Sequence, residues 1–175
     1  MMTEIESKDI FVQAMPIIKC KASKRILLCK WIKGDYKDRY TGLISPVNFK
    51  ENEANFREKL EKSAVSLLPA NLSSNLVNVE LVAILNFTDP PAYTEYVYMT
   101  YLSEDSDAIN DTVFDENPCH WFHWENIPFQ EMPEDDHLWY PKVLEQGLKV
   151  TGSFTFGSWS EKTLKCYKIE EMPQL

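Results

Sequence analysis

The segment that decides the fold consists of HWFHWENIPF (residues 120–129), MPEDD (132–136), WYP (139–141) and GSFTF (152–156). Its apolar, aromatic start predicts a strand over Cys119–Trp124. A helix is expected over Leu138–Gln146, with Gly147 after it as the residue that ends the helix. Two alternating runs, Val150–Phe156 and Thr163–Ile169, then predict a closing hairpin. The C-terminal third therefore combines strands with one helix.

Upstream of this segment the chain is dominated by strand patterns. Strands are predicted over Phe11–Ile18, Arg25–Trp31, Asn78–Thr88 and Tyr93–Leu102, and Tyr40–Val47 predicts a short strand or loop. The first two runs are close enough along the chain to form a hairpin or neighbouring strands.

A second helix is predicted over Glu51–Leu67, before Pro69. Its apolar side chains recur at helical spacing and share one face: Phe56, Leu60, Ala64 and Leu67. Strands mixed with two helices predict an α/β or α+β domain. We expect a flexible N-terminal segment over residues 1–9 and a single domain over 10–175.

The charge of the chain limits its partners. The 175 residues carry a formal net charge of −9. A duplex nucleic acid requires a basic footprint, and an anionic membrane surface repels an acidic protein, so neither partner is expected. A free nucleotide stays compatible with this charge, because a local pocket can overcome it.

The cysteines and the N-terminus predict a cytoplasmic location. The four cysteines, Cys20, Cys29, Cys119 and Cys166, show no CxxC pairing and no zinc-module spacing. The start MMTEIESKDIF has neither the basic nor the apolar region of a signal peptide, and the apolar runs are too short to span a bilayer. We therefore expect reduced thiols, with Cys119 as a small buried apolar residue.

The order of residues in the C-terminal third resembles the MutT homologues of animals, the oxidised purine nucleoside triphosphate hydrolases of the Nudix superfamily. In that family a Trp-Phe pair precedes an Ile-Pro-Phe turn, two adjacent Asp residues, a helix start with Trp and Pro, and a Gly-x-Phe-x-Phe strand. The similarity covers roughly residues 10–171. It implies a Nudix-type α/β/α sandwich with a mixed β-sheet.

The resemblance also implies that this chain carries a degenerate form of the family's catalytic box. The box carries glutamates on one helical face because Mg²⁺ prefers oxygen ligands. Its glycine aligns here with Ser45, and its first glutamate aligns with Glu51. The core of the box falls in residues 57–65, where two registers remain open. The positions of the core glutamates hold Lys59, Lys62 and Ser63 in one register, and Leu60, Ser63 and Ala64 in the other.

Other carboxylates are candidates for a rearranged Mg²⁺ site. Glu58 and Glu61 are three residues apart on one helical face, and Glu116 matches an acidic loop residue near the family's metal. With Glu51 they form the candidate metal ligands, and Glu58, Glu61 and Glu116 are the candidate catalytic residues. The alternative is a solvated helix face on which Lys59 and Lys62 pair with the glutamates.

The family's base-binding pocket is kept in part. Asp135 and Asp136 match the two aspartates that recognise the purine edge, whereas a stacking tryptophan is replaced by Pro133 and a recognition asparagine by Thr41. We expect Asp135, Asp136 and Thr41 to be nucleotide-binding residues. The alternative for the aspartates is capping of the helix at Leu138, since Asp is a favoured N-cap.

Three functions follow from the resemblance. The leading hypothesis is a pseudoenzyme that binds a purine nucleotide or a protein partner and has lost the catalytic glutamates. The second is an active, Mg²⁺-dependent nucleoside triphosphate diphosphohydrolase with a rearranged metal site, releasing pyrophosphate. The third is a structural or scaffold subunit.

Overall fold

The fold is built on a mixed sheet. The computed structural model describes residues 8–19, 24–103, 112–157 and 163–173. Its strands are β1 (Asp9–Lys19), β2 (Lys24–Lys30), β3 (Tyr40–Thr41), β4 (Leu43–Val47), β5 (Leu76–Phe87), β6 (Tyr93–Leu102), β7 (Thr112–Phe114), β8 (Asn117–His123), β9 (Val150–Thr155) and β10 (Cys166–Glu171). Its α-helices are α1 (Phe56–Ser66), α2 (Ala70–Ser73) and α3 (Asp136–Leu144), and two 3₁₀ turns span Trp124–Asn126 and Phe129–Glu131.

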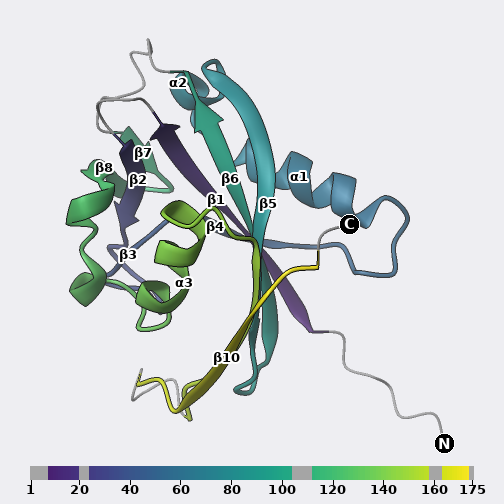
Figure 1. The fold of residues 1–175 in the computed structure, drawn as a ribbon. Coiled ribbons are helices and arrows are strands. Elements are labelled where there is room, and N and C mark those ends of the chain that lie inside the picture. The colour runs from purple at the N-terminus through teal and green to yellow at the C-terminus, as the bar shows by residue number, and fades with distance from the viewer. Residues whose placement is uncertain (1–7, 20–23, 104–111, 158–162, 174–175) are drawn as a thin grey trace, which may run out of the picture.

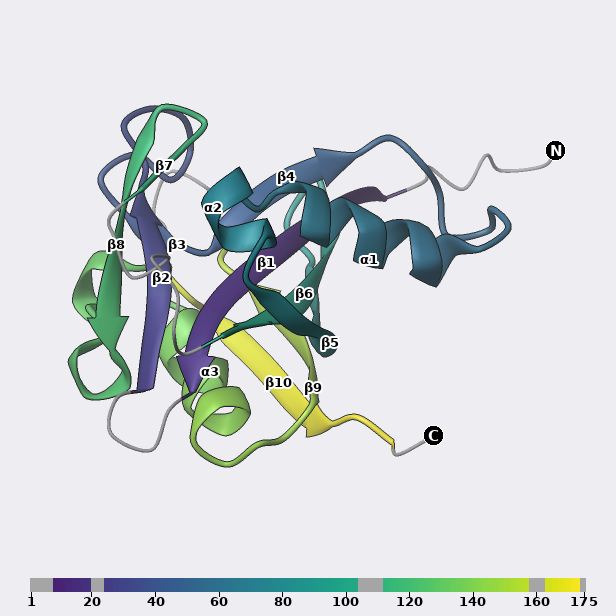
Figure 2. The same cartoon turned by 90° about the horizontal axis from the view of Figure 1, so that it is seen from above.

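The strand order is β10-β9-β5-β6-β1-β2-β8-β7, with β3 added to β2 and β4 added to β1. The pairs β1–β6 and β5–β9 are parallel, and the other pairs are antiparallel. The two ends of the sheet lie well apart when seen from above, with β8 and β7 on the left and β9 and β10 at the lower right (Figure 2).

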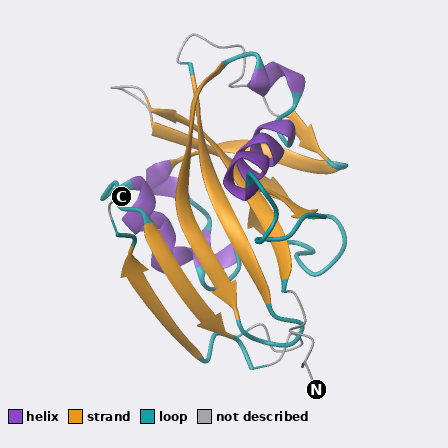
Figure 3. Ribbon diagram, turned by 90° about the vertical axis from the view of Figure 1, so that its right-hand side faces the viewer, coloured by secondary structure: helices purple, strands orange, loops and turns teal. Residues whose placement is uncertain are grey.

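Helices cover both faces of the central strands (Figure 1). Leu60 and Ala64 of α1 pack on one face, with Val12 and Tyr96 among their neighbours. Seen from that side, a helix crosses in front of the long strands (Figure 3). On the other face, Trp139 of α3 belongs to the largest buried cluster. Successive residues of a strand point to opposite faces of the sheet. β1 and β6 therefore contribute side chains both to the cluster under α1 and to the cluster under α3. The predicted α/β class with a mixed sheet is confirmed.

The boundaries of both long helices differ from the prediction. The first was expected from Glu51, but α1 begins at Phe56 because Asn55 adopts a left-handed backbone with φ 59° and residues 51–55 form turns. The second was expected from Leu138, but α3 begins at Asp136. Gly147, with φ 66°, follows α3 as predicted.

The expectation of reduced thiols is wrong for one pair. Cys29 and Cys119 form a disulfide. The two residues are direct partners in the antiparallel β2–β8 pair, although 90 residues separate them along the chain. Cys166 is free and exposed, and Cys20 lies outside the described residues. Only cross-strand register brings the first two together, and spacing along the chain carries no sign of it.

Two further expectations concern the N-terminus and the membrane. Residues 1–7 of the predicted flexible segment lie outside the described residues, and Asp9 already begins β1. Within the described residues, no helix has both the length and the apolar character that a bilayer crossing requires.

Candidate functional site

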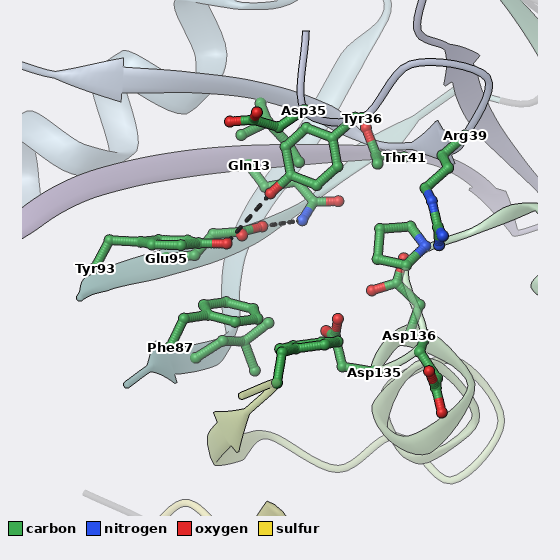
Figure 4. A pocket seen from close by; sticks show the side chains of 15 residues that line it. Gln13, Asp35, Tyr36, Arg39, Thr41, Phe87, Tyr93, Glu95, Asp135 and Asp136 are labelled. Atoms are coloured by element: carbon green, nitrogen blue, oxygen red, sulfur yellow. Dashed lines mark hydrogen bonds between the residues drawn. The ribbon is translucent and has the colours of Figure 1, made fainter. Parts of the chain in front are cut away.

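A pocket lies on the α3 side of the sheet, bounded by three parts of the chain (Figure 4). Its base is formed by side chains from β1, β5 and β6, including Gln13, Phe87 and Glu95. One wall comes from the segment between β2 and β4, and the other comes from residues 133–136 at the start of α3. Residues far apart in the sequence thus converge because neighbouring strands and α3 place them together.

The base of the pocket holds a buried polar pair. Glu95 and Gln13 are each 3% exposed, and the side-chain amide of Gln13 donates a hydrogen bond to Glu95. The other side of the same amide, Oε1, accepts hydrogen bonds from Gly42 N at 3.1 Å and Tyr140 OH at 3.5 Å. Burial and the nearby Asp135 raise the pKa of Glu95 to about 8, against the opposing effect of Gln13. Glu95 is therefore mostly protonated at neutral pH.

Two adjacent carboxyl groups face this pair from the start of α3. Asp135 and Asp136 are 3% and 5% exposed. Burial, then the Asp135 charge, then the Glu95 charge raise the pKa of Asp136 well above its usual range. Burial also raises the pKa of Asp135, although the hydrogen bond from Trp139 opposes this. Both raised pKa values favour a proton held within the pair, which places a donor beside acceptors.

The alternative role for this pair, capping of α3 by a side chain, is not observed. Asp135 occupies the N-cap position with a helical backbone, and its side chain makes no capping hydrogen bond. Its Oδ2 instead accepts a hydrogen bond from the indole Nε1 of Trp139 at 3.1 Å. The carboxyl group is thus held by α3 and stays on the pocket wall.

Thr41 lies in the same pocket as the two aspartates. Its Oγ1 accepts a hydrogen bond from Trp31 Nε1 at 2.6 Å and donates one to the carbonyl of Gly42 at 2.7 Å. Gly42 has no room for a side chain, because a Cβ there would collide with Gln13 Oε1 and would lie 2.8 Å from the carbonyl oxygen of Ala14. The close approach of β3 and β4 to β1 therefore fixes the positions of the Thr41 and Gln13 side chains.

Aromatic rings line the remaining surface. The rings of Phe87 and Tyr93 stack with centroids 4.6 Å apart, and the ring of Phe156 also stacks with Phe87, with centroids 6.3 Å apart. The hydroxyl groups of Tyr36 and Tyr93 lie 3.3 Å apart within hydrogen-bonding distance, and loss of solvent raises both pKa values. Flat apolar rings beside a few polar groups form a surface suited to an aromatic ligand.

The predicted metal ligands lie elsewhere. Glu51 accepts a hydrogen bond from Tyr96 OH at 3.2 Å, Glu58 pairs with Lys62 at 3.0 Å, and Glu116 pairs with Lys33 at 3.4 Å. Glu61 is exposed on α1. Across the described residues, no group of three or more His, Cys, Asp and Glu side chains is placed to hold a metal ion. This donor arrangement does not fit the Mg²⁺ site of an active box.

Several pocket residues were missed from the sequence. Gln13 is the one polar residue in Phe11–Ile18, and Glu95 is the one charged residue in Tyr93–Leu102. Such a residue inside a strand of mostly apolar or aromatic residues is a signal in itself. Tyr36 and Arg39 belong to a charged turn segment that gave no comparable signal. The predicted residues Asp135, Asp136 and Thr41 do line one pocket together.

No protein-family model and no curated protein matches this sequence. Solved structures do match its fold. A mutator MutT protein from Bacillus halodurans superposes with a TM-score of 0.60 at 12% identity, covering 93% of this chain and 97% of that chain. A Nudix hydrolase from Nitrosomonas europaea gives 0.56 at 18% identity, with 82% and 76% covered.

A third match is the Nudix domain of Shewanella oneidensis NrtR in complex with ADP ribose. Its TM-score is 0.53 at 11% identity, with 82% of this chain and 88% of that chain covered. At these identities the likeness concerns the fold alone. The chain has the Nudix fold, as the resemblance implied.

Proposed function

We propose that this chain binds the base of a purine nucleotide in the pocket beside α3, and that it does so without metal-dependent hydrolysis. The observation that carries the proposal is the buried pair Asp135 and Asp136, which share one pocket with Thr41. A protonated carboxyl next to an ionised one presents a donor and an acceptor side by side, which matches the edge of a purine ring.

The surroundings of the pair support a flat ligand. Phe87, Tyr93 and Phe156 present apolar ring surface to the same space, and Tyr36 adds a hydroxyl group. A base seated here buries its faces against rings while its edge meets the carboxyls. One structure with this fold, the NrtR domain, is a complex with ADP ribose, which is itself an adenine nucleotide.

The proposal of binding without hydrolysis is supported by the partners of the predicted catalytic residues. Glu58 is paired with Lys62 on α1, and Glu116 is paired with Lys33. Lys59 stands at one turn from Lys62 and pairs with Glu53 at 2.9 Å. Ammonium groups in the place of metal ligands repel a divalent cation.

The test is thermal unfolding with purine and pyrimidine nucleotides, with and without Mg²⁺, run beside an assay for pyrophosphate release. At about 100-fold excess over Kd a ligand adds about 2.7 kcal/mol to the stability of the folded state. For a chain of this size, that raises Tm by about 5–10 °C. We expect this shift for purine nucleotides without Mg²⁺, with no pyrophosphate released.

The variants are Asp136→Ala and its matched control Glu145→Ala, which changes an exposed carboxyl at the other end of α3. Asp136→Ala removes both the donor and the acceptor and should lose the purine shift, whereas Glu145→Ala should keep it. Mg²⁺-dependent pyrophosphate release that Glu58→Gln abolishes would instead establish the rearranged metal site. If no purine nucleotide raises the Tm of the wild-type protein, the binding proposal is wrong and a structural or scaffold role is favoured.

A further inference from the structure

The pocket is strongly acidic for a nucleotide site. Among the described residues that line it, five carry carboxyl groups and one carries a cation, Arg39. The acids are Asp35, Glu95, Glu134, Asp135 and Asp136. Asp35 is exposed and Glu134 is half-buried, so these two lie toward solvent, whereas the other three are buried.

The available cation does not neutralise the buried acids. Arg39 Nη1 donates a hydrogen bond to the carbonyl of Met132 at 3.0 Å. Within the described part of the chain, none of the three buried carboxyls forms an ion pair with lysine or arginine. Each is held instead by uncharged groups or by another acid, such as Gln13 on Glu95 and Trp139 on Asp135. Buried carboxyls without a cation are costly when ionised.

The rings in the same pocket add a second, independent feature. Tyr36, Phe87 and Tyr93 line the pocket that also holds the acids (Figure 4). Phe156 lines the same pocket. The face of an aromatic ring carries negative charge density and attracts a cation placed over it. Rings and carboxyls around one space therefore favour the same kind of ligand, namely a flat group with positive charge.

We infer that the preferred ligand of this pocket is a cationic purine, one alkylated on a ring nitrogen, and that Glu95 is the residue that selects the positive charge. The inference rests on the proposed function, since it takes purine binding in this pocket as given.

The ionisation of Glu95 agrees with this selection. Burial and Asp135 raise its pKa to about 8, so the empty pocket holds a proton there at neutral pH. A cationic base favours the ionised carboxylate, so its binding should release a proton from the pocket. A neutral base supplies no such compensation and leaves Glu95 protonated.

The experiment is isothermal titration calorimetry at neutral pH with two pairs of nucleosides, which lack phosphate. The pairs are 7-methylguanosine against guanosine and 1-methyladenosine against adenosine. In the wild-type protein we expect at least one methylated cation to bind about tenfold or more tightly than its neutral parent. Repeating the titration in buffers of different ionisation enthalpy should show proton release for the cation only.

Two variants locate the effect. Glu95→Gln should reduce the affinity ratio between the cation and its neutral parent to below about threefold. Glu145→Gln on the exposed end of α3 should leave the ratio unchanged. The wild-type ratio is measured without any substitution, so a failure of Glu95→Gln to fold leaves the inference open to refutation.

The outcomes separate the inference from the proposed function. Neutral purines that bind as tightly as both cations would overturn the inference and leave the proposed function standing. Binding of the two cations with equal competition by benzyltrimethylammonium would support a cation pocket and overturn the purine proposal. Failure of all four nucleosides to bind would overturn both.

Discussion

The side-chain amide of Gln13 on β1 donates a hydrogen bond to the buried carboxyl of Glu95 on β6, its parallel neighbour in the sheet. The two residues therefore join the strands at the base of the pocket, on the face covered by α3. Since an amide donor binds a protonated or an ionised carboxyl, the pair holds its position as Glu95 titrates. The protonation state of Glu95 then depends on its burial and on the charges around it.

The first prediction concerns stability against pH. Glu95 has a pKa of about 8 in the folded protein and 4.5 as its ordinary value. Between these values the folded state binds the proton and the unfolded state does not, so stability falls as pH rises from about 4.5 to 8. Each pKa unit is about 1.4 kcal/mol, so the loss should be about 3–5 kcal/mol. The groups around Glu95 are Asp135, Asp136, Tyr36, Tyr93 and Tyr140.

Urea unfolding of the wild type and Glu95→Gln across this pH range checks the prediction. The glutamine keeps the shape of the protonated acid and has no proton to lose. The difference in unfolding free energy between variant and wild type should therefore grow in favour of the variant as pH rises. A constant difference would show that Glu95 titrates with an ordinary pKa.

The second prediction concerns the close approach at Gly42. A Cβ there meets the carbonyl of Ala14 at 2.8 Å, and this backbone atom has no freedom to move away. Gly42→Ala should therefore destabilise the fold by about 1–3 kcal/mol and displace Gln13 at the base of the pocket. Purine binding by the variant should weaken as well, measured by thermal unfolding with and without nucleotide.

Gly34→Ala serves as its control. Gly34 has φ +84° and no atom within 4 Å of a built Cβ. Its substitution strains the backbone at about 1 kcal/mol without crowding the pocket. Equal loss of ligand binding in the two variants would argue against a specific role for the contact between Gly42 and Gln13.

The sequence predicts the strands and the Nudix fold well, because alternation and residue order are local properties. Tyr93–Leu102 is predicted with the bounds of β6. Asp135, Asp136 and Thr41 line one pocket, and their role in nucleotide binding stays a prediction. The start of α1 is predicted too early, because the charged residues of the helical pattern begin in residues 51–55, which form turns. Asn55 ends these turns in a left-handed backbone conformation, and α1 begins after it.

The contacts that the sequence does not predict are those made by pairing between strands that are distant along the chain. Glu95 occupies a strand position like its neighbours, and only the parallel register with β1 places it beside Gln13. Cys29 and Cys119 become partners through the register of β2 with β8. Both relationships depend on tertiary structure that periodicity along the chain does not encode.

The third prediction concerns this disulfide. It closes a loop of 90 residues between β2 and β8 inside a buried cluster. Replacing both cysteines, as Cys29→Ala with Cys119→Ala, should lower the unfolding free energy by about 2–5 kcal/mol under oxidising conditions. Cys166→Ser, at an exposed and free cysteine, should leave it unchanged. If a reducing agent has no effect on wild-type unfolding, the bond contributes nothing to stability.

The last prediction concerns the register of α1, which decides where its charged residues lie. Leu60 is fully buried and packs with Ile10 and Tyr96 on the sheet, whereas Glu61 beside it is exposed. Leu60→Ala should therefore cost about 2–5 kcal/mol through lost contacts and a residual cavity, and Glu61→Ala should cost less than about 0.5 kcal/mol. Urea unfolding of the two variants gives both values. A large loss of unfolding free energy in Glu61→Ala would contradict this register. It would mean that α1 is rotated about its axis and that Glu61 is buried instead of exposed.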